Sequence, residues 1–132
     1  MKAIDTNVLV RFLVKDNEQQ AKVVYRKFKK IEGKKEVLFI PIPVVLKTIW
    51  VLESVYGVKR QEILDSINDL LLMPILDFEA QPAIRSFVSS AREDKVDLSD
   101  LFIGNYAKYL GCDSVITFDK RASKLGIFEL LK

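Results

Sequence analysis

Aspartates that follow apolar segments are the residues of this chain best suited to chemistry. Asp5 follows Ala3-Ile4, Asp119 follows a late apolar run, and Asp97 and Asp100 flank Leu98-Ser99. The 132-residue chain has no histidine and one cysteine, so carboxylates are its main candidates for metal binding or acid–base catalysis. Carboxylate oxygens suit Mg²⁺ or Mn²⁺, and such ions promote phosphodiester hydrolysis. If these aspartates converge, the sequence predicts an acidic metal site that hydrolyses phosphodiesters.

Each aspartate also has a purely structural interpretation. Aspartate is among the best helix N-caps, and a helical pattern follows Asp5, Asp97 and Asp119. Asp97 and Asp100 are three residues apart, so either can cap the same helix or complement its dipole. Capping explains each residue singly, whereas their shared position at the ends of strands or loops favours a common site.

The elements that must position these aspartates alternate in type. Strands are expected at residues 1–4, 37–40, 74–76, 114–118 and 127–130. Helices are expected at residues 6–14, 17–31, 43–56, 59–73, 80–94 and 99–110, with Gly33, Gly57 and Gly111 as stops. This alternation predicts an α/β fold with a parallel sheet, whose functional crevice lies beyond the carboxyl ends of the strands.

Length and composition limit the remaining possibilities. A chain of 132 residues predicts one domain spanning residues 1–132. No apolar run reaches the length of a membrane-spanning helix, no signal peptide is recognised, and Cys112 has no partner for an internal disulfide. We therefore expect a cytoplasmic protein without a membrane partner.

A basic segment is the main feature of the charge pattern. The net charge is only +3, but residues 26–35 are rich in lysine and arginine with a single glutamate. The simpler interpretation is the solvated face of a helix end. The functional one is contact with an RNA backbone, made by Arg11, Arg26, Lys27, Lys29 and Lys30.

Read together, these motifs resemble the PIN-domain family, and VapC-type toxins of toxin–antitoxin pairs in particular. The resemblance rests on Asp5-Thr6-Asn7-Val8-Leu9, Asp97-Leu98-Ser99-Asp100-Leu101 and Ile116-Thr117-Phe118-Asp119, and it covers essentially the whole chain. It implies a three-layer α/β/α sandwich with a short parallel sheet and a ribonuclease that depends on Mg²⁺ or Mn²⁺. It also implies an RNA substrate, a cognate antitoxin and a homodimer.

The resemblance assigns roles to individual residues. Asp5, Asp100 and Asp119 match the family's metal-binding aspartates, and Asp97 matches an accessory acidic position. The supporting hydrogen-bonding residues would be Thr6, Asn7 and Thr117.

Lys47 departs from the family pattern, because it stands where the family usually has a glutamate. Three explanations compete: a naturally inactive homologue, a lysine that partly replaces the charge of one metal ion, and an inactivating change introduced into the sequence. The leading expectation is a ribonuclease impaired by Lys47. The alternatives are a catalytically inactive module that binds RNA or protein and, less favoured, a receiver-like phosphatase domain.

The apolar helix that carries Lys47 poses a second choice. Its side chains are expected to be mostly core. Alternatively Trp50 and Tyr56, together with Phe12 and Leu13, form a dimer or antitoxin surface.

Overall fold

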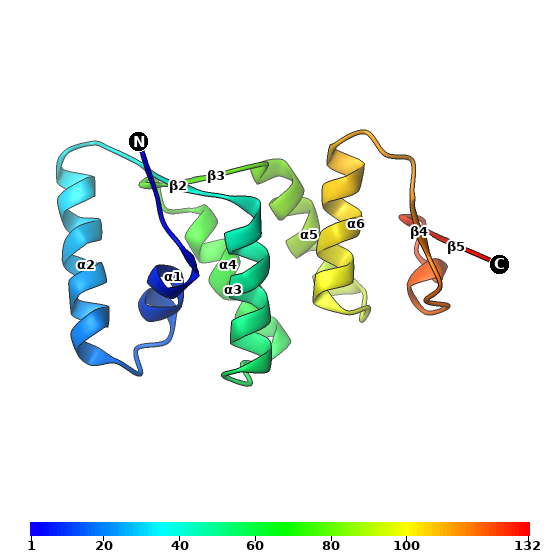
Figure 1. Cartoon of the computed structure of the whole chain (residues 1–132), viewed down its shortest axis with the longest axis horizontal. Helices are drawn as coiled ribbons and strands as arrows, with labels where there is room; N and C mark the ends of the chain where they lie inside the picture. The colour runs from blue at the N-terminus through cyan, green and yellow to red at the C-terminus, as the bar shows by residue number, and fades with distance from the viewer. The chain divides into compact units, whose positions relative to one another are not determined.

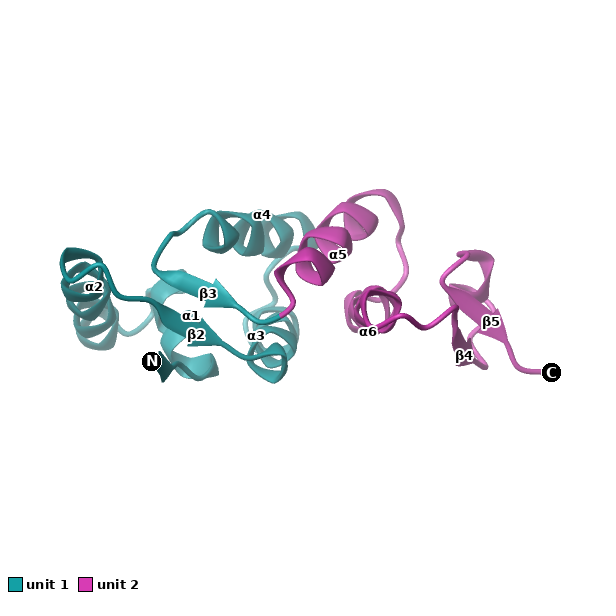
Figure 2. Cartoon of the chain, turned by 90° about the horizontal axis from the view of Figure 1, so that it is seen from above, with its two compact units in different colours: residues 1–79 teal, residues 80–132 magenta.

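A computed structural model describes every residue of the chain, from 1 to 132. The chain divides into two compact units, residues 1–79 and residues 80–132, which Figure 2 shows in separate colours. Helices and short parallel strands alternate through both units (Figure 1). The predicted α/β class is therefore confirmed, while a single domain spanning both units stays a prediction.

Unit 1, residues 1–79, is built on a three-stranded parallel sheet. Its strands are β1 (Lys2–Ala3), β2 (Leu38–Ile40) and β3 (Leu76–Phe78), in the order β1-β2-β3. Leu38 pairs with Leu76 and Ile40 with Phe78, and all four side chains are buried. The residues between them, Phe39 and Asp77, point to the other face, because side chains alternate along a strand. One apolar face of the sheet therefore carries the core of the unit.

Four helices connect these strands: α1 (Thr6–Leu13), α2 (Glu18–Gly33), α3 (Ile42–Ser54) and α4 (Arg60–Leu71). Connections between adjacent parallel strands are almost always right-handed. The connections from β1 to β2 and from β2 to β3 both step the same way across the sheet, so their helices lie on the same face. Figure 1 shows these helices on one side of the strands. The fully buried side chains that they contribute include Leu9, Val10, Ile49, Leu52, Ile63 and Leu64.

Unit 2, residues 80–132, combines a helix pair with a two-stranded parallel sheet. The helices are α5 (Gln81–Glu93) and α6 (Leu98–Tyr109), and the strands are β4 (Val115–Thr117) and β5 (Phe128–Leu130). A short 3₁₀ helix, Ala122–Lys124, lies between the strands.

Two aromatic contacts hold unit 2 together. The rings of Phe87 on α5 and Phe102 on α6 meet edge to face, with centroids 5.2 Å apart. A Cβ added at Gly104 would lie 3.0 Å from Cζ of Phe128. The absence of a side chain at Gly104 therefore lets α6 approach β5 closely.

Most predicted element boundaries differ from the structure by one or two residues, and the glycine stops and strand β3 are the informative cases. Gly57 and Gly111 adopt φ of +61° and +97° after their helices, as a glycine stop requires. Gly33 instead lies within α2, and Lys35 takes the left-handed conformation with φ of +56°. Strand β3 begins at Leu76, two residues later than the predicted start, because Pro74 and Ile75 belong to the turn before it.

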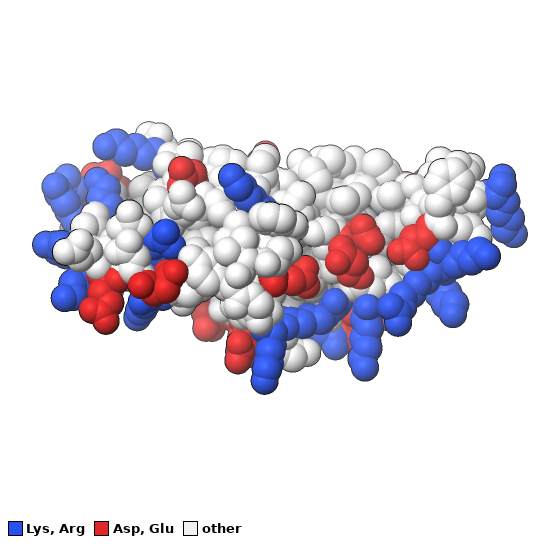
Figure 3. Space-filling model, turned by 60° about the horizontal axis from the view of Figure 1, so that its bottom comes forward, with Lys and Arg blue, Asp and Glu red and all other residues white.

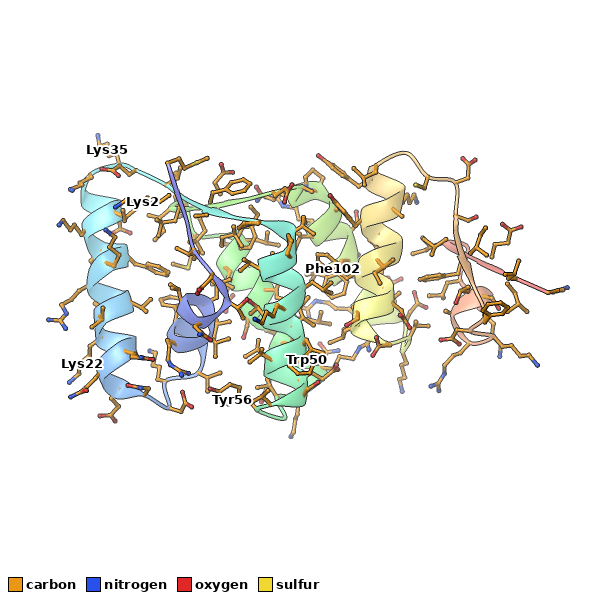
Figure 4. All side chains as sticks on the ribbon, viewed as in Figure 1. Lys2, Lys22, Lys35, Trp50, Tyr56 and Phe102 are labelled. Carbon is orange, nitrogen blue, oxygen red and sulfur yellow. The ribbon has the colours of Figure 1, made fainter.

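The expectation that α3 contributes mostly to the core agrees with its buried residues, and Trp50 is the exception. The side chain of Trp50 is 53% exposed, whereas Val45, Ile49 and Leu52 are buried. Tyr56 is half-buried and lies beyond the C-terminal end of α3, beside the connection between α1 and α2 (Figure 4). None of the helices combines the length and the hydropathy that crossing a membrane requires.

Candidate metal site

Asp5 lies in unit 1, directly beyond the carboxyl end of β1. The N–H of Ile4 donates to the carbonyl of Phe39 at 3.1 Å, which continues the pairing of β1 with β2 up to this point. Asp5 is the N-cap of α1, and its Oδ1 accepts from the N–H of Asn7 at 3.1 Å. The side chain is exposed, and no protein group donates to its second carboxylate oxygen. Asp5 is thus a helix cap with one oxygen free for a cation.

The two residues after Asp5 differ in their surroundings. Thr6 is buried, with 6% of its surface exposed, whereas Asn7 is exposed and contributes its backbone N–H to the cap. Their supporting roles, apart from this cap, stay a prediction.

Lys47 lies on α3 and is exposed, without an ion-pair partner in unit 1. The start of α3 has no side-chain cap of its own, because Pro41 occupies the N-cap position. Instead Glu79, just after β3, accepts from the N–H of Ile42 through Oε1 at 2.8 Å. Glu79 also donates its own N–H to the carbonyl of Ile40 at 3.0 Å.

Glu79 was not singled out from the sequence. The predicted strand ended at residue 76, which placed Glu79 in the following loop rather than at the end of a strand. The signal that was available is the pattern Leu76-Asp77-Phe78-Glu79, in which buried and acidic side chains alternate. The carboxylate of Glu79 fixes the N-terminus of α3, the helix that carries Lys47.

Unit 2 brings the other three aspartates into one electrostatic group. Asp97 is the N-cap of α6, and its Oδ2 accepts from the N–H of Asp100 at 3.3 Å. Asp119 follows β4, and its Oδ1 accepts from the N–H groups of Arg121 at 2.8 Å and Ala122 at 3.2 Å. Thr117 accepts the N–H of Asp119 through Oγ1 at 3.0 Å. Thr117 therefore orders the turn that carries Asp119.

The pKa of Asp100 records how these charges interact. Partial burial raises the pKa of its carboxyl above the ordinary value, and the negative charges of Asp97 and then Asp119 raise it further. An acid in this position is stabilised in its ionised form by a nearby cation. Of the candidate aspartates, Asp100 is the one whose pKa is raised in this way.

The donor set fits a hard divalent cation, since every candidate ligand is a carboxylate oxygen. Asp5, Asp97 and Asp119 each use one oxygen to accept backbone N–H groups, which fixes the orientation of the other oxygen. The structure contains no group of three or more acidic or thiol side chains arranged to hold a metal ion.

The predicted RNA-binding residues differ in whether their side chains already bond to other residues of unit 1. Arg11 is engaged within unit 1, where it contacts Asp16 at 3.4 Å, the Tyr56 hydroxyl at 3.1 Å and Gln20 at 2.5 Å. The other four lie on α2 with exposed side chains; they are Arg26, Lys27, Lys29 and Lys30. Among them Lys29 pairs weakly with Glu32, at 3.8 Å. Contact between these residues and RNA stays a prediction.

Comparison with known proteins decides which family has this arrangement. A family model described as "PIN domain" matches residues 2–127. The chain belongs to the PIN-domain family. This PIN domain is 29% identical over 126 residues to a VapC ribonuclease of Aquifex aeolicus (strain VF5), an alignment that covers 96% of this chain and 93% of that protein. No solved structure matches the chain with significance.

Membership of the PIN-domain family agrees with the architecture. Helices connected by short parallel strands are the elements of the predicted three-layer α/β/α sandwich. The family model begins at Lys2 and ends at Ile127, so it includes all four candidate aspartates and Lys47.

Proposed function

We propose that this PIN domain is a VapC-type endoribonuclease, dependent on Mg²⁺ or Mn²⁺ and impaired by Lys47. The observation that carries the proposal is the match to the PIN-domain family over residues 2–127, which include Asp97 at the start of α6, Asp100 in its first turn and Asp119 after β4. Clustered carboxylates are costly unless a cation neutralises them, which is the usual reason to assemble them. The similarity to a VapC ribonuclease supports RNA as the substrate.

The proposed ligand set is Asp5, Asp100 and Asp119, with Asp97 assisting. A bound divalent ion would supply activation of water and charge stabilisation at the scissile phosphate. The chain's own contribution is orientation: backbone N–H groups hold one oxygen of Asp5, Asp97 and Asp119. Thr117 steadies Asp119 by accepting its backbone N–H, and the N–H of Asn7 steadies Asp5 by donating to its carboxylate.

Lys47 opposes this function in two ways. It removes a carboxylate from the position where the family usually has a glutamate, and it adds a positive charge that repels a divalent ion. In the proposed site, the ammonium group would also partly neutralise the aspartates, so a cation would gain less by binding. The proposal therefore includes weaker metal binding and slower cleavage than with glutamate at position 47.

The same residue supports a second candidate function. A PIN domain whose site is neutralised by Lys47 would bind RNA or a protein partner without cutting. Under the leading proposal the chain has a cognate antitoxin, forms a homodimer and acts in the cytoplasm, as expected of VapC-type toxins. Under the second candidate function, the chain binds RNA or a protein partner and does not cleave RNA.

The test compares three forms of the protein: the chain as given, Lys47→Glu and Lys47→Gln. Glutamine removes the positive charge without adding a carboxylate, so it separates repulsion from ligand loss. Calorimetric titration with Mn²⁺ should give an affinity that rises from lysine to glutamine to glutamate. Cleavage of structured RNA with Mn²⁺ should follow the same order. If Lys47→Glu binds Mn²⁺ tightly and cuts no RNA, the nuclease proposal fails and the binding module takes its place.

A further inference from the structure

A groove of about 520 Å³ lies between α1 and α2 in unit 1, and the proposed cleavage site does not include it. Its apolar part is formed by Phe12, Ala21 and Tyr25. The charged side chains around it are Lys15, Glu18, Lys22 and Arg26. None of the four candidate aspartates lines this groove.

One face of α2 forms most of the groove. Glu18, Lys22 and Arg26 are spaced by four residues, and Ala21 and Tyr25 lie between them on the same face. The ring of Phe12 packs against the buried ring of Phe28, with centroids 5.0 Å apart. The contact with Phe28 holds the apolar part in place before any ligand binds.

Of the two aromatic residues that line the groove, Tyr25 is the exposed one, with 56% of its surface accessible. Large aromatic side chains are normally well covered, and an exposed one beside cations is typical of surfaces that stack nucleic-acid bases. Lys29 lies 5.6 Å from the centre of the Tyr25 ring, which adds a further positive charge at this point.

The charges around the groove are unbalanced. Three cations face a single carboxylate, Glu18, and neither Lys15, Lys22 nor Arg26 takes part in an ion pair. The cations Arg11 and Lys29 do form ion pairs, with Asp16 and Glu32. Figure 3 shows Lys and Arg side chains gathered at the end of the molecule where α2 lies, and Figure 4 places Lys22 on the N-terminal half of that helix.

We propose that this groove binds an unpaired nucleotide of an RNA strand. The base would stack against Tyr25 and Phe12, and the flanking phosphates would be held by Lys15, Lys22 and Arg26. The inference rests on the proposed function in taking RNA as the ligand. An apolar segment of a partner protein would fill the floor but leave the excess of three cations over one carboxylate unbalanced, which makes RNA the better match.

A fluorescent reporter tests the stacking. Trp50 is the chain's single tryptophan, so the double variant Trp50→Phe/Tyr25→Trp places the only indole in the groove. A short single-stranded RNA, added without divalent ions so that no cleavage occurs, should quench this indole at the concentrations where labelled RNA gains anisotropy. An abasic strand of equal length should bind more weakly and leave the fluorescence unchanged. Binding of RNA without quenching, or equal quenching by the abasic strand, would overturn the proposal.

Point variants give an independent measurement. Tyr25→Ala should weaken RNA binding about 5- to 150-fold, the range found when one stacking aromatic is removed, and Tyr25→Phe should retain it. Lys22→Glu should reduce the slope of log affinity against log salt by about 0.7 or more. Lys59→Glu is the matched control, because it makes the same charge change at the start of α4, outside the groove.

The outcomes separate this proposal from the nuclease proposal. If Lys22→Glu and Lys59→Glu weaken RNA binding equally, only general charge matters and the groove has no role. If Tyr25→Ala leaves RNA binding unchanged but abolishes binding of an apolar partner peptide, the groove belongs to a protein. Neither result depends on whether Lys47→Glu cleaves RNA.

Discussion

Replacing Glu79 with alanine should destabilise unit 1 and disturb the start of α3. The Oε1 of Glu79 accepts from the N–H of Ile42 at 2.8 Å, and Ile42 is buried with 8% of its surface exposed. Removal of the carboxylate leaves that N–H without its acceptor. A hydrogen bond to a charged group contributes about 1.5–3 kcal/mol, so we expect a loss of this size in the free energy of unfolding.

Thermal unfolding followed by circular dichroism measures the effect. For a chain of this length, a loss of about 1.5–3 kcal/mol corresponds to a fall in Tm of roughly 5–11 °C. Glu79→Gln keeps an acceptor at the same position and should recover most of the loss. Asp77→Ala is the matched control, because Asp77 is an exposed acidic residue two positions earlier, on the strand that Glu79 follows.

The same variant has a functional consequence if α3 carries a ligand position. In the Lys47→Glu background, Glu79→Ala should lower the affinity for Mn²⁺, because the helix that holds position 47 is no longer fixed at its N-terminus. Asp77→Ala should leave the affinity unchanged. Equal losses of Tm from Glu79→Ala and Asp77→Ala would refute the capping argument itself.

Three further predictions follow from contacts described above. The pKa of Asp100 is higher in the folded protein than its ordinary value of 3.8, so ionisation of this carboxyl costs stability as pH rises through and above that value. Asp100→Asn should therefore raise Tm at neutral pH without metal, and this advantage should disappear near pH 3. The variant should also lose the stabilisation that Mn²⁺ gives the unaltered chain. Gly104→Ala should lower the free energy of unfolding by about 1–3 kcal/mol, measured by chemical denaturation, because the new Cβ would meet the ring of Phe128. Gly33→Ala should leave the free energy of unfolding unchanged or raise it, because no atom lies within 4 Å of the new Cβ. Tyr56→Phe removes the hydroxyl that donates to Asp16 at 3.1 Å and should cost about 0.5–1.5 kcal/mol by the same measurement.

The periodicity of the sequence is sufficient to predict the order of elements, because buried side chains recur at helical or strand spacing. Gly57 and Gly111 could be predicted as stops, since a positive φ after a helix favours glycine. The same rule fails at Gly33, which is the last residue of α2, and Lys35 takes the left-handed conformation instead. Local rules identify which residues tolerate a turn, but tertiary packing decides which of them is used.

The candidate site could be predicted only at the level of single residues. The capping roles of Asp5 and Asp97 were foreseeable, because each precedes a helical pattern. The bond from Ile42 to Glu79 was not, since the two residues are far apart in sequence and meet only when β2 and β3 pair. The engagement of Arg11 with Asp16 and Tyr56 was equally hidden, because it joins three elements through side chains.

The caps formed by the aspartates affect how loss-of-function variants are interpreted. Asp5, Asp97 and Asp119 each satisfy backbone N–H groups at the start of a helix or turn. Alanine at Asp5 or Asp97 would remove a helix cap as well as a proposed ligand, and loss of each cap would lower the free energy of unfolding by about 1 kcal/mol. An inactive alanine variant would therefore not distinguish loss of structure from loss of a metal ligand. Asparagine caps nearly as well as aspartate and lacks the charge. Asparagine is therefore the informative choice at these positions, and a catalytically silent protein made for antitoxin or RNA capture should carry it rather than alanine.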